Sequence, residues 1–159
     1  MSIFPTRILL ATDGSRNVAP ATDVAVQLSK VTGSELHLLY VGEDAYSATL
    51  IYPETTNPGG VEREDPVLLE QLQRQFEQMS RRVLETEVEK VREAGGTVAQ
   101  THLRTGKAAA EIVDLAEELG TGLVVVGSRG LGRALMGSVS DSVVRHAHCP
   151  VLVVRREEE

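Results

Sequence analysis

The chain has 159 residues, with 16 Lys and Arg against 23 Asp and Glu, so its formal net charge is −7. Hydrophobic residues make up 42% and charged residues 25%, the balance of one globular domain, which we expect to span residues 1–159. The acidic charge disfavours binding to nucleic acid or to an anionic membrane, and no apolar run reaches the roughly 20 residues that span a bilayer.

The chain begins with residues 1–14, which lack the charged region, the long apolar region and the cleavage site of a secretory signal, so we expect a cytoplasmic protein. Short aliphatic and β-branched runs then recur along the chain and predict strands. These runs are Arg7–Ala11, Leu36–Val41, Thr97–Leu103, Leu123–Val126 and Val151–Val154. Most are almost continuously apolar, as in strands covered on both faces. The third run alternates with polar residues, which places it nearer a sheet edge.

The first predicted helix follows the turn Asp13-Gly14-Ser15 and runs to about Lys30, with Ser15 or Asn17 as its N-cap and Gly33 at its end. Its expected buried face consists of Ala21, Val24, Ala25, Leu28 and Val31.

Residues 43–64 show no clear period and contain several Pro and Gly, which predicts a long loop of functional or mobile character. Asp65-Pro66 then signals the start of a long helix that ends at Gly95-Gly96. Its expected core-facing stripe is Leu69, Leu72, Phe76, Met79 and Val83.

Two further helices are predicted near the C-terminus. The first spans Ala108–Leu119 with Ile112, Leu115 and Leu119 facing inward, and the second is capped by Ser138 and runs to about Ala147. Residues 155–159 form a charged tail, which we interpret as a solvated end. Alternation of strands and helices predicts an α/β domain with a parallel sheet and right-handed crossovers.

Two segments follow predicted strands at the sheet edge where ligands of open α/β folds bind. They are Ala11–Ser15, and Val126–Arg133 with Gly137-Ser138 opening the next helix. Glycines allow backbone N–H groups to approach an anion closely, and a helix N-terminus adds partial positive charge. Residues 127–145 also carry Arg129, Arg133 and Arg145 against Asp141, a local excess of positive charge that suits phosphate.

Other phosphate-binding classes are excluded. The chain lacks GxxxxGK[ST], so it is not a P-loop NTPase, and Gly130-Leu131-Gly132 lacks the third glycine of the dinucleotide fingerprint. A phosphoacceptor receiver domain needs clustered acids after its first strand, whereas Asp13 stands alone there.

The run GSRG…GSVSDSVVRHAHCPVLVV, together with ATDGS after the first strand, resembles the universal stress protein family over nearly the whole chain. The resemblance implies a single-domain, open, five-stranded parallel sheet of order 3-2-1-4-5, with helices on both faces. It also implies a homodimer that pairs strand 151–154 with the same strand of a second subunit, an edge that otherwise stays exposed.

Members of the nucleotide-binding branch carry G-x2-G-x9-G-[ST], which implies ATP, with Mg²⁺, as the ligand here. By resemblance, Gly127 and Gly130 contact phosphates, Gly137 and Ser138 hold phosphate and ribose, Asp13 lies near the ribose, and the Val41 backbone binds adenine. The full set of expected binding residues is Ala11, Thr12, Asp13, Val41, Val126, Gly127, Arg129, Gly130, Gly137, Ser138, Val139 and Ser140. This chain has six residues, Leu131–Met136, where the family pattern has nine.

The expected function is an ATP-binding stress-response or regulatory module with at most slow hydrolysis, because no general base lies in either loop. Two alternatives stay open: a nucleotide-free dimeric interaction protein, which docks partners through its dimer surface or the 43–64 loop, and a binder of AMP or a cyclic nucleotide.

Several eye-catching side chains have plainer interpretations. His146, His148 and Cys149 could suggest a metal site, but residues two apart on a helix diverge, so we expect none. His37 and His102 lie within predicted strands and are expected to be structural. Arg104 and Lys107 either face the phosphates or are ordinary loop charges.

Overall fold

The computed structural model describes residues 2–42, 66–128 and 137–156. Its strands are β1 (Arg7–Thr12), β2 (Glu35–Gly42), β3 (Val98–Thr105), β4 (Leu123–Gly127) and β5 (Val151–Val154). They form one five-stranded, fully parallel sheet of order β3-β2-β1-β4-β5. The predicted strand order is therefore confirmed, and the alternating run near residue 100 lies at an edge of the sheet.

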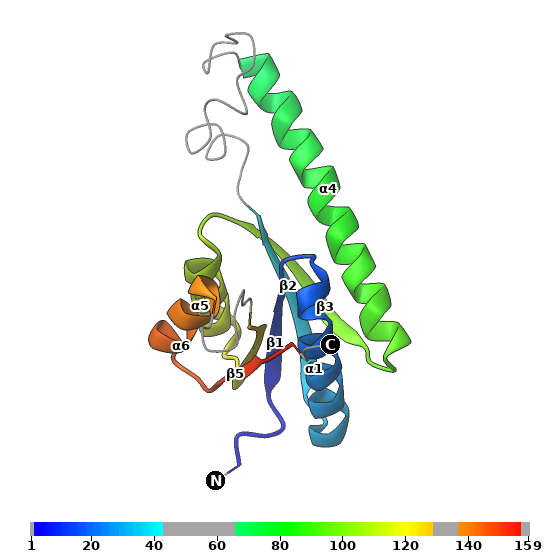
Figure 1. Ribbon diagram of the computed structural model, residues 1–159, viewed down its shortest axis with the longest axis vertical. Helices are drawn as coiled ribbons and strands as arrows, with labels where there is room; N and C mark the ends of the chain where they lie inside the picture. Colours follow the sequence, from blue (N-terminus) through cyan, green and yellow to red (C-terminus); the bar gives the residue numbers. More distant parts are fainter. Residues whose placement is uncertain (1, 43–65, 129–136, 157–159) are drawn as a thin grey trace.

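Helices cover both faces of this sheet (Figure 1). They are α1 (Ala19–Thr32), preceded by the 3-10 turn η1 (Arg16–Val18), then α4 (Pro66–Glu93), α5 (Ala108–Leu119) and α6 (Ser138–His146). One face packs against α1 and α4 and the other against α5 and α6. No helix within the described ranges is both long and apolar enough to cross a membrane.

The central strand β1 is buried on both faces. Ile8, Leu9 and Leu10 have no exposed surface; the first and third pack on the α1–α4 face, while Leu9 packs on the α5–α6 face. A strand covered on both sides needs no polar alternation, which explains the continuous apolar run in the sequence.

The expected start and buried face of α1 are partly wrong. Its N-cap is Val18, without a side-chain capping bond, because η1 comes between the turn at Ser15 and the helix. Val31, expected in the core, is 85% exposed, whereas Val26 is 1% exposed. The buried arc is rotated toward Val26 because α4 lies on that side: a Cβ at Gly96 would lie 2.9 Å from Val26 and 3.1 Å from Val91. The predicted end is confirmed, since Gly33 caps the helix with φ 70°.

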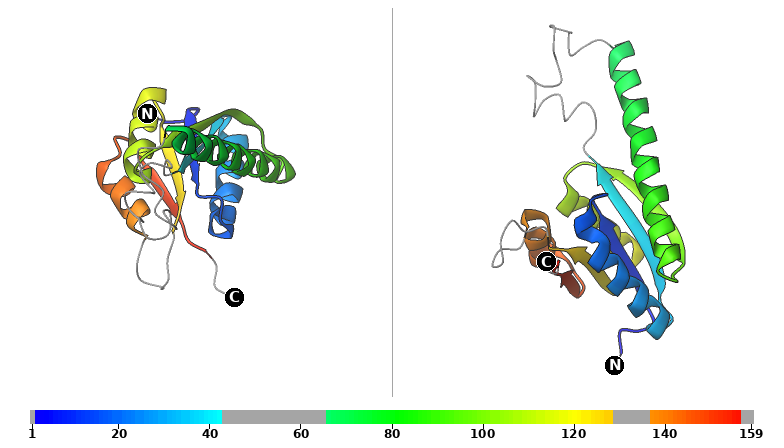
Figure 2. Two further views of the ribbon diagram at one scale, coloured as in Figure 1. Left: turned by 90° about the horizontal axis from the view of Figure 1, so that it is seen from above. Right: turned by 45° about the vertical axis from the view of Figure 1, so that its right-hand side comes forward.

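Helix α4 begins at Pro66, as predicted, and its N-terminal half extends beyond the end of the sheet (Figures 1 and 2). Its buried residues are Ser80, Leu84, Glu87 and Val91, all in the C-terminal half. The predicted stripe is correspondingly half-buried at best, and Met79 is 53% exposed. The sequence period was that of one face of a helix, but only half of the helix has the sheet beneath it.

The bounds of α5 are confirmed, with Ile112 and Leu115 buried. The expected capping role of Ser138 is wrong: it is the first residue of α6, and Gly137 is the N-cap in extended conformation. The 43–64 loop and residues 157–159 of the tail lie outside the described residues.

Candidate functional site

The carboxyl ends of β1 and β4 are neighbours at the centre of the sheet, and the helices that follow them lie on opposite faces. β1 is followed by α1 on one face, and β4 is followed by α6 on the other. A reversal of this kind is the topological switch point at which open α/β sheets bind ligands. The described parts of the two segments singled out in the sequence therefore lie at neighbouring strand ends.

The turn after β1 is held by its own side chains. Gly14 N donates to Thr12 Oγ1 at 3.0 Å, and Ser15 N donates to Asp13 Oδ1 at 2.8 Å. Gly14 has φ 78°, and a Cβ there would lie 2.9 Å from Val83 Cγ1 of α4. Both the dihedral and the contact require glycine. The exposed carboxylate of Asp13 is thereby positioned at the edge of the sheet.

A buried hydroxyl joins the end of β4 to the first turn of α6. Ser140 is 1% exposed, and its Oγ donates to the carbonyl of Gly127 at 2.7 Å. Gly137 accepts the first helical bond, from Asp141 N at 3.0 Å. Because the first N–H groups of a helix have no partner within it, this arrangement directs donors and the positive end of the helix dipole toward the sheet edge. The geometry suits an anion.

The end of β2 completes this edge. Gly106 N, between β3 and α5, donates to Gly42 O at 3.0 Å and fixes the two strand ends together. The ring of Phe76 fills the space that a side chain at Gly42 would need. Val41 and Ala11 are half-buried against the α5–α6 cluster, so they line the apolar side of this edge.

The expected binding residues thus fall into four groups. Asp13, Gly127, Gly137 and Ser138 are exposed or half-buried at the edge, and Ala11, Val41 and Val139 are half-buried against the same cluster. Thr12, Val126 and Ser140 are buried, which makes them supports of the edge. Arg129, Gly130 and residues 131–136, including the shortened loop, lie outside the described residues.

Two cations that could have faced a phosphate are held by acids. Arg104 pairs with Glu118 and, at 3.7 Å, with Glu111, both on α5. The hydrogen bond from Arg104 lowers the pKa of the Glu118 carboxyl. Arg145 pairs with Asp141 at 3.1 Å within α6, so it adds no net charge at the edge. Lys107 is exposed directly before α5.

The residues considered for a metal site lie near the end of α6. His146 Nδ1 lies 2.8 Å from the carbonyl of Ser142, and His148 is 3.6 Å from Glu117. Burial raises the pKa of the Cys149 thiol. Among residues 2–42, 66–128 and 137–156, no three metal-ligating side chains gather.

Sequence reasoning missed two residues that shape the edge, Gly106 and Val83. The Thr-Gly-Lys turn between a strand and a helix was a signal for the first, since glycine there marks a tight connection. Val83 was predicted only as part of the core-facing stripe of α4, and no signal in the sequence indicated that it would pack beneath Gly14.

The comparison with known proteins decides the family. A sequence model described as "Universal stress protein family" matches residues 5–155. Universal stress protein YxiE of Bacillus subtilis is 35% identical over 152 residues, which cover 94% of this chain and 98% of the relative. The chain belongs to the universal stress protein family.

Solved structures of universal stress proteins share the fold. One, in complex with cAMP, is 24% identical with a TM-score of 0.64, and covers 94% of this chain and 95% of its own. Another, from Archaeoglobus fulgidus in complex with dAMP, is 18% identical with a TM-score of 0.61, and covers 95% of this chain and 98% of its own. At these identities the likeness concerns the fold.

Proposed function

We propose that this universal stress protein binds an adenine nucleotide, ATP with Mg²⁺, at the carboxyl edge formed by β1, β2, β4 and α6. The observation that carries the proposal is the bond from Ser140 to Gly127, which joins the N-terminus of α6 to the end of β4, the strand next to β1 and its Asp13 turn. Fold relatives in complex with cAMP and dAMP support the same ligand class.

In this arrangement the adenine lies against the half-buried Val41 and Ala11, and the Asp13 carboxylate accepts from ribose hydroxyls. The phosphates lie toward Gly127, Gly137 and Ser138, where helix N–H groups meet negative charge. Mg²⁺ in nucleotide sites is held mainly by phosphate oxygens and one or two carboxylates. Asp13 is a carboxylate that fits this role.

The function that follows is regulatory binding with at most slow hydrolysis. Efficient phosphoryl transfer needs a residue that orients the attacking water. Apart from the exposed Lys107, the described side chains that we place at this edge are short, apolar or acidic, and Arg104 is held by α5 carboxylates. We assign the protein to the cytoplasm and expect no nucleic-acid or membrane partner.

We further propose that the protein is a homodimer through β5. Val151–Val154 form an edge strand, and all four side chains are half-buried in the single chain. Exposed apolar edges are usually paired or covered. Sedimentation that shows a monomer at micromolar concentration contradicts this part. A dimer that binds no nucleotide supports the alternative function, an interaction protein.

The nucleotide proposal is tested by calorimetric titration with ATP, ADP, AMP, cAMP and adenosine, each with and without Mg²⁺. The decisive variant is Ser138→Glu, which places a negative charge in the first turn of α6. An acid there stabilises the helix, so folding is preserved while a bound phosphate is repelled. We expect ATP affinity to fall about tenfold or more, the loss of one charge-assisted hydrogen bond of ~1.5–3 kcal/mol, with adenosine affinity unchanged.

Ser142→Glu, which adds the same charge one turn further along α6, is the matched control and should bind ATP as the wild type does. Equal ATP affinity in the two variants contradicts the placement of the phosphates. Absence of binding by every nucleotide contradicts the proposed function itself.

A further inference from the structure

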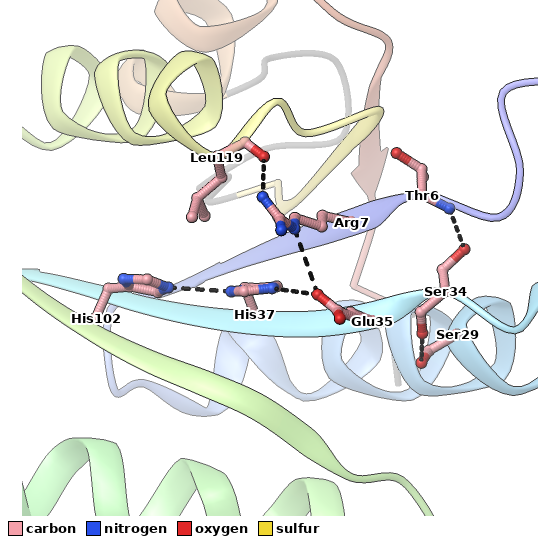
Figure 3. A network of polar contacts seen from close by, with 8 residues as sticks. All are labelled: Thr6, Arg7, Ser29, Ser34, Glu35, His37, His102 and Leu119. Atoms are coloured by element: carbon pink, nitrogen blue, oxygen red, sulfur yellow. Dashed lines mark hydrogen bonds and ion pairs between the residues drawn. The ribbon is translucent and has the colours of Figure 1, made fainter.

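A chain of polar contacts crosses the sheet under α5, away from the carboxyl edge (Figure 3). His102 Nε2 of β3 lies 3.1 Å from His37 Nδ1 of β2, and His37 Nε2 lies 3.2 Å from Glu35 Oε2. Arg7 Nε of β1 is 3.4 Å from the same carboxylate oxygen, and its Nη1 donates to the carbonyl of Leu119 at 2.8 Å. The contacts thus link three strands to the end of α5.

The two imidazoles meet because β3 contains a register shift. Leu36 pairs with Val98, but the next residue, His37, pairs with Gln100, so Ala99 is the extra residue of a bulge. Leu39 therefore pairs with His102, which brings the side chain of His102 to the face of His37 and Leu39. The rings stack with centroids 5.4 Å apart and planes 23° apart. Bulges commonly re-aim one side chain in this way.

The hydrogen-bond pattern limits how many protons the pair can hold. The carboxylate of Glu35 accepts, so His37 Nε2–H donates to it. With both rings neutral, His37 Nδ1 accepts from His102 Nε2–H. One added proton is accommodated when His37 donates from both nitrogens and His102 adopts its other tautomer. A second added proton sets two N–H donors of like charge against each other at the 3.1 Å contact.

The surroundings of His102 oppose its protonation. Its pKa is lowered, first by burial, then by His37 and by Arg104 on the same strand. The acid nearby is Glu118 of α5, which raises the pKa of His102 but is itself bonded to Arg104, as is Glu111. On the other side of the pair, Arg7 shares the Glu35 carboxylate with His37.

We propose that the contact between His37 and His102 is an acid-sensitive latch of the edge strand β3. The latch is closed while the pair holds at most one added proton, and it opens when both rings are protonated. When both rings are protonated, two N–H donors face each other at a site with little access to water, since His37 is 4% exposed. Opening of the latch separates these two donors. β3 is the strand that can yield, because it has a neighbour on one side only.

The direction of the pH dependence follows from the His102 shift. In the open form His102 has the ordinary histidine pKa of 6.5, whereas in the closed form the pKa of His102 is lowered. As the pH falls below 6.5, protons therefore bind the open form first and shift the equilibrium toward it. Above that pH the latch stays closed.

Amide hydrogen exchange tests the latch, with rates corrected for the intrinsic pH dependence of exchange. Between pH 7.5 and 5, we expect protection of the β3 amides to fall. The fall should be about tenfold for each unit by which the pKa of His102 is lower in the closed form than in the open form. Protection of Ile8–Leu10 in β1 should not change. His102→Gln keeps an N–H donor toward His37 and does not titrate, so its β3 protection should be equal at both pH values. His148→Gln is the matched control at a histidine whose side chain is 69% exposed, and it should behave as the wild type does.

Ring-proton NMR of the wild type provides a second measurement that needs no variant. The His102 resonances should titrate below the ordinary range of histidine, together with the loss of β3 protection. The proposal is overturned if β3 protection is independent of pH in the wild type, if His102→Gln retains the acid-induced loss, or if His102 titrates with an ordinary midpoint.

Discussion

Replacement of Ser140 by alanine tests the joint between β4 and α6. The lost bond is the 2.7 Å contact from Oγ of Ser140, which is 1% exposed, to Gly127 O. Because the acceptor carbonyl belongs to the half-buried Gly127, the loss of this hydrogen bond should cost about 0.5–1.5 kcal/mol. For a chain of this length, each kcal/mol corresponds to a fall of about 2–4 °C in Tm.

The assay is urea unfolding of Ser140→Ala beside Ser142→Ala. Ser142 lies on the same helix, half-buried, with its Oγ 3.4 Å from the exposed His146. Both variants gain helix propensity in the same direction, so their difference isolates the buried bond. ATP affinity should also fall in Ser140→Ala alone, because the α6 N-terminus loses its link to Gly127. Equal unfolding free energies in the two variants refute the structural role of the bond, whatever the ligand data show.

Four further substitutions, in three tests, probe the described packing and electrostatics. Val26→Ala should lower the unfolding free energy by about 2 kcal/mol, whereas Val31→Ala should change it by less than about 0.5 kcal/mol. Equal changes for the two variants in urea unfolding would contradict the buried face assigned to α1. Gly33→Ala should destabilise by about 1–2 kcal/mol through its φ of 70° alone, since no atom lies within 4 Å of the new Cβ, and an unchanged Tm rules this out. Arg104→Gln should weaken the dependence of the unfolding free energy on pH in the acid range. In the folded protein the pKa of Glu118 lies below its ordinary value of 4.5. The stabilisation from ionised Glu118 is therefore present above pH 4.5 and is lost as the pH falls through the lower, folded-state pKa. An acid limb as steep as that of the wild type in chemical denaturation from pH 7 to 3 excludes this pairing.

The sequence predicted the strands well because buried parallel strands leave a strong signature. Leu9 and Leu10 show it, as apolar neighbours on opposite faces. The strand order came from the family resemblance, since hydrophobic runs alone do not specify neighbours. The buried face of α1 was predicted less well than the strands. Val31 and Val26 are equally apolar, and the position of α4 determines which of them is buried.

Part of the candidate edge was also accessible to sequence reasoning. Gly127 and Gly137 were singled out because glycine at a strand end lets backbone N–H groups approach an anion, whereas the role of Asp13 came from the family resemblance. The bulge at Ala99 was not, because one extra residue in a strand leaves no mark in a single sequence. His37 and His102 were therefore assigned separate structural roles, although the register shift joins them.

The strand order has a consequence for the order of assembly during synthesis. β1 pairs with β2, which follows it closely in the chain, but Ile8–Leu10 gain their second neighbour, Leu123–Val125, only when β4 emerges from the ribosome. At typical translation rates that interval is on the order of ten seconds. For this period a strand whose residues Ile8–Leu10 are fully buried in the finished fold presents an unpaired edge, the template for association with other chains. A chain truncated before Leu123 retains that edge permanently and should aggregate in proportion to its concentration.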